Sequence, residues 1–157
     1  MFEKNYFQTM SNEERQKMVR VFSKPELAIE ILSVFGLILT FIYVAIHYGQ
    51  LPDTIPTHFG FSGEPDGWGG KGILWLFPCI GLFLYAMMTV LIFFPQAYNT
   101  PTRVTAENAF RLYRFMRVTM AGMKLVFIWL FGYIIYATIQ TAYGNTPGVG
   151  GAFLWIF

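Results

Sequence analysis

The sequence is poor in cysteine and in charge, and both shortages narrow the class of protein. Its 157 residues include a single cysteine, Cys79, so one chain cannot build a disulfide framework or a thiolate zinc site. Cys79 falls within an apolar run and is predicted to be a buried apolar side chain. Charged residues make up 13%, against roughly 25% in an ordinary soluble domain. The formal net charge of +2 is too small to indicate nucleic-acid binding.

Signals for secretion and for catalysis are also lacking. The first apolar run follows about 25 mostly polar residues and is too long for a signal peptide, so we expect the chain to keep its amino terminus. Ser62 has no G-x-S-x-G context, and Cys79 would lie at lipid depth, so neither is a candidate nucleophile. The sequence therefore predicts no catalytic residue, no cofactor and no enzymatic activity.

Hydrophobic residues, at 55% of the chain, gather in three long runs that predict membrane spans over 26–48, 73–95 and 115–143. The first run has about 22 residues and would rise roughly 33 Å as a helix, enough to cross the hydrocarbon core. Thr105 is the predicted N-cap of a third helix that continues to Ala142, on the order of 57 Å long. We predict an all-α integral membrane protein with three transmembrane helices in a single domain, 1–157.

The remaining segments are assigned to the two sides of the membrane by their basic residues. The leader, 1–24, and the second loop with its helix extension, 96–114, hold most of the lysines and arginines. The first loop, 49–71, has only Lys71, and the tail, 144–157, has none. The positive-inside rule then predicts a cytoplasmic amino terminus, with the first loop and the carboxyl terminus outside. The tail is too short to span and resembles the opening of a fourth span.

Two capping boxes precede the first span. Ser11 and Glu14 have the spacing in which each side chain bonds the other's backbone N–H, which predicts a short helix over Asn12–Phe22. Met18, Val21 and Phe22 would share one side of it, with basic residues around the rest, as in amphipathic helices that lie on the anionic inner leaflet. A solvated leader helix without a role is the alternative. Ser23 and Glu26 repeat the spacing at the start of the first span.

The first loop, 51–71, has three prolines and five glycines and cannot be helical. Pro52 and Pro56 hold their neighbours extended, which predicts a short strand-like piece over Thr54–Phe59. The sequence 64–67, Glu-Pro-Asp-Gly, is a strong turn signal, and Trp68 is predicted to return to the membrane interface. We expect a compact, turn-rich cap over the outer ends of the helices.

The cap motif resembles a known family. A first span, then L-P-D-x-I-P-x-H-F and G-x-x-D-x-W-x-x-K, then a second span, is similar to a small bacterial membrane domain, domain of unknown function 1648, which also forms the front half of SdpI-type immunity proteins. The resemblance covers roughly Leu27–Gly144. It implies a bacterial plasma membrane and no reaction. The residues that carry it are Leu51, Pro52, Asp53, Ile55, Pro56, His58, Phe59, Gly63, Asp66, Trp68 and Lys71, with Thr105, Glu107, Asn108, Arg111 and Tyr113 in the second loop.

The cap residues have three possible roles. In a structural role, Asp53 and Asp66 cap turns, His58 bonds a backbone carbonyl and Lys71 extends to the headgroups. In a second role the cap is a surface for a partner or peptide. In a third, His58, Asp53 and Asp66, with Glu64, hold a divalent metal, although their spacing is irregular. We favour the structural role and predict no metal.

Among the ionisable side chains of the predicted spans, Glu30 and Lys124 stand out, because they lie inside the bilayer at similar depths from the cytoplasmic side. An ion pair would reduce the cost of each charge, which insertion scales put at roughly 2.5–3.5 kcal/mol. Alternatively each side chain snorkels to the inner headgroups, which we favour for Lys124.

Taken together, these features favour a non-enzymatic binding, sensing or immunity-type membrane module that acts through its outer cap. Its expected partners are the lipid bilayer and either a membrane protein subunit or a peptide, and no nucleic acid. An accessory subunit of a larger membrane complex is the second hypothesis. A metal-dependent membrane enzyme using the outer loop is the third.

Overall fold

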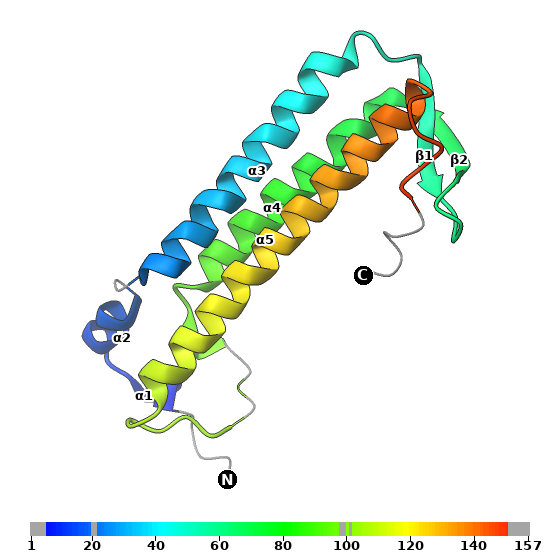
Figure 1. The fold of residues 1–157 in the computed structure, drawn as a ribbon. Coiled ribbons are helices and arrows are strands. Elements are labelled where there is room, and N and C mark those ends of the chain that lie inside the picture. Colours follow the sequence, from blue (N-terminus) through cyan, green and yellow to red (C-terminus); the bar gives the residue numbers. More distant parts are fainter. Residues whose placement is uncertain (1–5, 20–21, 98–99, 101, 151–157) are drawn as a thin grey trace. The chain divides into compact units, whose positions relative to one another are not determined.

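A computed structural model describes residues 6–19, 22–97, 100 and 102–150. Within these residues, three helical segments are long and apolar enough to cross a membrane, namely Lys24–Tyr48, Lys71–Leu91 and Ala109–Ala142. The prediction of three helices long and apolar enough to span is thereby confirmed, although the second ends at Leu91 and not at residue 95. The elements follow in the order α1 Tyr6–Thr9, α2 Asn12–Val19, α3 Lys24–Tyr48, β1 Thr54–Phe59, β2 Pro65–Gly70, η1 Lys71–Trp75, α4 Leu76–Leu91, η2 Pro95–Ala97 and α5 Ala109–Ala142 (Figure 1).

The chain forms two compact units, and each long helix contributes to both. The first unit comprises Met1–Leu32 and Phe83–Leu125, and the second comprises Ser33–Leu82 and Val126–Phe157. The first therefore contains α1, α2 and the beginnings of α3 and α5, while the second contains the β-hairpin.

In the first unit, the predicted capping box at Ser11 and Glu14 forms in both directions, and the one at Ser23 and Glu26 forms through the Glu26 carboxylate. The Ser11 N–H donates to Glu14 Oε2 at 3.0 Å, and the Glu14 N–H donates to Ser11 Oγ at 3.2 Å. Helix α2 is described over Asn12–Val19, and Phe22, the predicted last residue of the helix, is not helical. Val21 and the side chain of Met18 lie outside the described part, so the predicted amphipathic face stays a prediction. Ser23 bonds Glu26 Oε2 through its N–H and its hydroxyl, both at 2.6 Å, as α3 begins.

The core of the first unit packs the leader against the beginning of α5. Its buried side chains are Met10, Ile92, Val104, Ala109 and Tyr113. The Tyr113 hydroxyl donates to the Ile92 carbonyl at 2.7 Å, which satisfies a backbone group just beyond the end of α4.

Helix α5 begins at Ala109, so the predicted start at Thr105 is wrong. Thr105 begins a single preceding turn, in which its carbonyl accepts the Ala109 N–H at 2.9 Å. The Thr105 N–H donates to Asn108 Oδ1 at 2.9 Å, so in this turn the Asn108 side chain satisfies the backbone of Thr105. With 34 residues, α5 is about 51 Å long.

An antiparallel pair of strands follows α3 in the second unit, so the all-α prediction is inexact. The strand over Thr54–Phe59 is confirmed as β1. The turn predicted at 64–67 is wrong, because Pro65–Gly70 forms β2. The chain reverses just before it, where the Gly60 N–H donates to the Glu64 carbonyl at 2.9 Å. Gly63 supplies the positive φ of 81° that this reversal requires.

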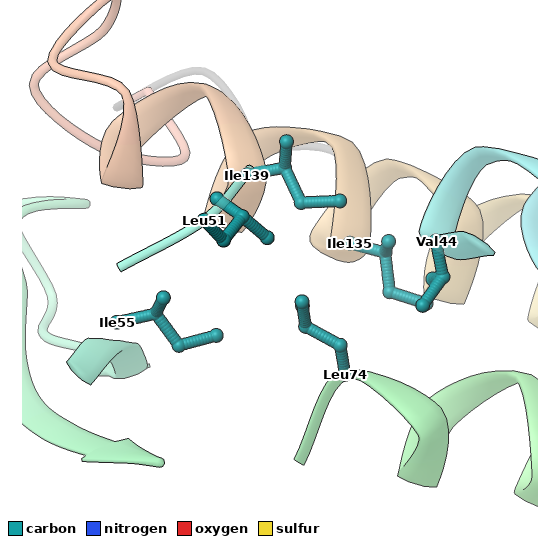
Figure 2. Close-up of a cluster of buried hydrophobic side chains, with 6 residues drawn as sticks. All are labelled: Val44, Leu51, Ile55, Leu74, Ile135 and Ile139. Carbon is teal, nitrogen blue, oxygen red and sulfur yellow. The ribbon is translucent and has the colours of Figure 1, made fainter. Parts of the chain in front are cut away.

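The core of the second unit joins the hairpin to all three long helical segments. Figure 2 shows six apolar side chains converging: Val44 from α3, Leu51 and Ile55 at the hairpin, Leu74 from η1, and Ile135 and Ile139 from α5. All six are at most 4% exposed. Burial of these side chains, at roughly 25 cal/mol per Å² of apolar area, holds the hairpin against the helices.

Cys79 of α4 is exposed on the protein surface, contrary to the prediction that it is buried. It lies in a candidate span, on the side of the helix that points away from the protein core. Hydropathy places a residue at membrane depth without saying which side of the helix it occupies.

Candidate functional site

The hairpin is irregular where its polar side chains occur. Pro56 pairs with Trp68 and His58 with Gly67, which leaves Thr57 as an extra residue on β1. Phe59 then pairs with Pro65, which leaves Asp66 as an extra residue on β2. Such bulges re-aim side chains and are common beside functional sites.

The two bulges bring His58 and Asp66 together. His58 Nδ1 is hydrogen-bonded to Asp66 Oδ1, and the two side chains are 73% and 53% exposed. An ionised carboxylate only accepts, so Nδ1 donates to the ionised Asp66 and Nε2 is available for another contact. The prediction that His58 bonds a backbone carbonyl is therefore wrong. A Cβ added at Gly67 would lie 3.0 Å from the His58 Cβ, so the small residue leaves room for the ring.

Lys71 joins the two ends of the hairpin at its base through several contacts. Its Nζ donates to the Leu51 carbonyl at 3.1 Å and lies 3.2 Å from Asp53 Oδ1. Its N–H donates to the Asp53 carbonyl at 3.0 Å, and Nζ lies over the Tyr48 ring, 5.5 Å from its centre. Lys71 thus has partners within the protein, where we predicted that it snorkels.

The remaining motif residues divide between structure and surface. Pro52 is exposed in the segment before β1, whereas Pro56 is fully buried within it. Phe59 ends β1, and Gly63 forms the reversal described above. Trp68 is 61% exposed on β2.

The metal ligands considered from the sequence do not converge. His58 and Asp66 are in contact, but Asp53 is at the hairpin base with Lys71. Within the described ranges, no group of three or more His, Cys, Asp or Glu side chains is placed to hold a metal ion.

A pocket of about 200 Å³ lies beneath the hairpin. Its wall is mostly apolar, with Thr57, His58 and Thr138 as its polar side chains. Val149, which follows α5, closes one side and was not anticipated from the sequence. The pocket is lined by Pro56, Thr57, His58, Phe59, Gly60, Ile73, Leu74, Phe77, Ile134, Ile135, Thr138 and Val149.

Val149 is fixed there by two hydrogen bonds. Its N–H donates to the Gly63 carbonyl at 2.9 Å, and its carbonyl accepts the Tyr133 hydroxyl at 2.7 Å. Gly144, with φ of 76°, lets the chain turn back after α5. The hairpin turn, the segment after α5 and the side of α5 are therefore joined at one point.

The first unit contains a separate cluster of polar side chains within the candidate spans. Lys124 Nζ forms an ion pair with Glu30 and donates to Thr89 Oγ1 at 3.1 Å. The Tyr85 hydroxyl donates to Glu30 Oε2 at 2.9 Å. The Lys124 side chain is fully buried, so the snorkelling that we favoured for it is wrong. Tyr85 and Thr89, spaced for one face of α4, were missed.

Glu26 and Arg117 form a further ion pair that was not predicted from the sequence. The Arg117 Nε lies 2.5 Å from Glu26 Oε1, and both side chains are at most 3% exposed. We interpreted Glu26 only as a capping residue and Arg117 only as a charge at the membrane edge. Glu26 and Glu30 are four residues apart, and Arg117 and Lys124 are seven apart, so each pair shares a helix face. That matched spacing was the one feature of the sequence from which the two ion pairs could have been predicted.

Among the described residues, these features define a mostly helical protein with three helices long and apolar enough to cross a membrane and a β-hairpin between the first two. Residues 35–82 match the family described as "Domain of unknown function (DUF1648)". The resemblance to domain of unknown function 1648 is thus confirmed over these residues, which include the hairpin and the His58–Asp66 pair, whereas the link to SdpI-type proteins stays a prediction.

A curated relative and the solved structures complete the comparison. A protein of Archaeoglobus fulgidus, named only "Uncharacterized protein", is 35% identical over 80 residues, or 45% of this chain. The chain covers 43% of that relative's length, so it spans less than half of it. No solved structure matches.

Proposed function

We propose that this chain is a non-enzymatic membrane protein whose hairpin cap binds an apolar side chain of a peptide or partner protein. The observation that supports this most directly is the pocket beneath the hairpin, with His58 at its rim. At about 200 Å³ it is smaller than the roughly 300–1,000 Å³ of sites for drug-sized ligands. A single apolar side chain is a better match than a cofactor.

The polar groups of the pocket suit the backbone of such a ligand. Asp66 fixes the His58 ring, so Nε2 is held in one orientation and can bond a peptide group at the rim. The apolar wall would take up the side chain, and the rim would set its direction. This combination of apolar anchor and few polar contacts is common in binding sites.

Site-specific photocrosslinking tests this proposal. A photoreactive benzoylphenylalanine replaces Phe59, which lines the pocket, and membranes of the producing cells are irradiated. We expect a discrete peptide or protein adduct, identified by mass spectrometry. The same residue in place of Phe83, which is 66% exposed on α4, is the matched control and should yield only lipid adducts.

A pocket-filling variant decides whether the adduct depends on the pocket. Thr138→Leu adds bulk to the wall and should lower the adduct yield at least tenfold, whereas Thr119→Leu, on the exposed side of α5, should leave it unchanged. Equal yields in both variants, or lipid adducts alone at position 59, would refute the proposal.

The proposed orientation places the amino terminus in the cytoplasm, with the cap and carboxyl terminus outside. The concentration of lysine and arginine in the leader and second loop supports it. A single cysteine at Gln50, with Cys79 replaced by alanine, should react with an impermeant maleimide added to intact cells. A cysteine at exposed Arg103 should react only after permeabilisation, and the reverse pattern would invert the topology.

An accessory subunit is the second candidate, because the second unit also has a lateral groove. It measures about 310 Å³ and is lined by Gly36, Leu39, Thr40, Tyr43, Ile128, Trp129, Gly132, Tyr133 and Tyr136. Small residues in a groove allow a further helix to approach closely. Leu39→Trp would block it, and Ile38→Trp, on the same helix outside the groove, is the control. Recovery of the unmodified chain alone at monomer size in mild detergent would exclude this candidate.

A further inference from the structure

The hairpin does not project away from the helices. Its base is at Lys71, where η1 begins, but Phe59 and Gly60 near its tip share a pocket with Phe77. Phe77 comes six residues after Lys71, which is on the order of 10 Å along the helical segment. The strands therefore run back beside the helices, as Figure 1 shows for β1 and the end of α5.

A second set of contacts gives the same depth. The Gly63 carbonyl at the hairpin reversal accepts the Val149 N–H, and the Val149 carbonyl accepts the Tyr133 hydroxyl. Tyr133 precedes the end of α5 at Ala142 by nine residues, or roughly 13 Å. The tip is thus held about two turns below the ends of the helices to which the hairpin is attached.

This depth is limited by the length of the second span. The helical segment Lys71–Leu91 has 21 residues, and the hydrocarbon core takes about 20. Little of this segment can therefore extend into water, so the level of Phe77 lies at or inside the membrane interface. Aromatic side chains of α3 and α5, including Tyr43 and Tyr136, occur near the same ends of their helices, as is usual at an interface.

The tip itself has the composition of an interfacial segment. Phe61 is 95% exposed, although its side chain is large and apolar. Glu64 and Asp66 are also exposed, and such charges suit the headgroup layer and not the hydrocarbon. The Phe61 ring is exposed in the isolated protein, lies next to charges and is at the depth of the interface. Contact with lipid would explain this combination.

We infer that the hairpin tip is a lipid-contacting surface, with Phe61 inserted into the phospholipid headgroup layer beside the second unit. This is separate from the ligand proposed for the pocket, since it concerns the outward side of the tip. It means that the cap is immersed at the membrane surface and is held there from both its base and its tip.

Spin-label depth measurements test the inference. On a Cys79→Ala background, Phe61→Cys at the tip and Gln50→Cys at the base receive nitroxide labels. The protein is placed in vesicles of phosphatidylcholine and phosphatidylglycerol, and collisions with oxygen and with a nickel chelate are compared. Ile38→Cys, 53% exposed on α3, is the hydrocarbon reference.

The order of the three label depths distinguishes an immersed tip from a solvated one. The label at 61 should lie deeper in the membrane than the label at 50, by about 10 Å at most. It should lie less deep than the label at 38. A hairpin that stands in water reverses the first order, with 61 the more accessible to nickel, and overturns the inference. Protection of 61 from both reagents would show that protein covers it and would also overturn the inference. Unchanged thermal unfolding of the labelled variants checks that they are folded.

Discussion

Glu26 and Arg117, 91 residues apart in the chain, form a two-point ion pair in the first unit. Arg117 Nε and its terminal nitrogen reach the two Glu26 oxygens at 2.5 and 2.9 Å. The guanidinium also lies 4.6 Å from the centre of the Phe22 ring and 5.5 Å from that of Tyr113. Removing either charge would leave the other buried.

Glu26→Gln should destabilise the protein by about 3–5 kcal/mol, since it removes the negative charge that Arg117 pairs with in the buried ion pair. Glutamine still fits a capping box, so the change isolates the charge from the helix cap. The free energy of unfolding in detergent is the measurement. Glu13→Gln, which removes the exposed pair with Lys17, is the control and should cost no more than about 1 kcal/mol. Similar losses in the two variants would contradict this account.

The Glu30–Lys124 pair should show strong coupling. Glu30→Gln and Lys124→Met each leave one polar partner unmatched in a candidate span, whereas the double variant leaves no charge. The double variant should therefore lose less stability than the sum of the two single variants, by roughly 0.5–3 kcal/mol. A double-mutant cycle of unfolding free energies measures this difference, and additive losses would show that the two side chains act independently.

Gly63 and Gly70 should respond oppositely to alanine. Gly63 has φ of 81°, and an added Cβ would lie 3.1 Å from the Gly150 carbonyl carbon, so Gly63→Ala should cost at least about 1–2 kcal/mol. Gly70 has φ of −66° and no atom within 4 Å of an added Cβ, so Gly70→Ala should be neutral or slightly stabilising. Thermal unfolding compares the two. Equal effects would mean that the backbone at Gly63 relaxes freely.

Glu14 should titrate below the ordinary range of glutamate. The hydrogen bond from the Ser11 N–H, followed by that from the Ser11 hydroxyl, lowers the pKa of the Glu14 carboxyl. Because the folded pKa is the lower one, the stabilisation is complete above the unfolded value, about 4.3, and is lost as the pH falls through the folded value.

Carbon NMR of the Glu14 carboxyl in detergent measures this titration. Ser11→Ala removes the hydroxyl and frees the first turn of α2, so the midpoint should rise toward the ordinary value. An unchanged midpoint in that variant would show that the capping box does not set the pKa.

Composition and local spacing were sufficient for most of the fold. The apolar runs predicted the three spans because crossing a bilayer needs about 20 apolar residues whatever the tertiary structure. The Ser–Glu spacings predicted both capping boxes, since these bonds join residues three apart. The prolines predicted β1. By contrast, the turn residues at 65–67 did not form the predicted turn. Pairing with β1 and the positive φ of Gly63 place the chain reversal before them.

The site depended on contacts that local reasoning does not reach. His58 and Asp66 were identified as motif residues, but their contact requires two bulges, which could not be predicted from the sequence. The pairing of Lys124 with Glu30, and of Arg117 with Glu26, joins helices far apart in the chain. The spacing of these charges indicated shared faces, and only the fold specifies which faces meet.

The two bulges of the hairpin also constrain how its length can change. The extra residue on β1, Thr57, and the extra residue on β2, Asp66, cancel, so the pairing before Pro56 and after His58 stays in one register. Losing either residue alone would remove its bulge and leave the other, so the two strands would no longer match in length between the Pro56–Trp68 and Phe59–Pro65 pairs. Among relatives, gaps in this hairpin should therefore arise in matched couples, one per strand, and a lone gap should mark a cap that has been rebuilt.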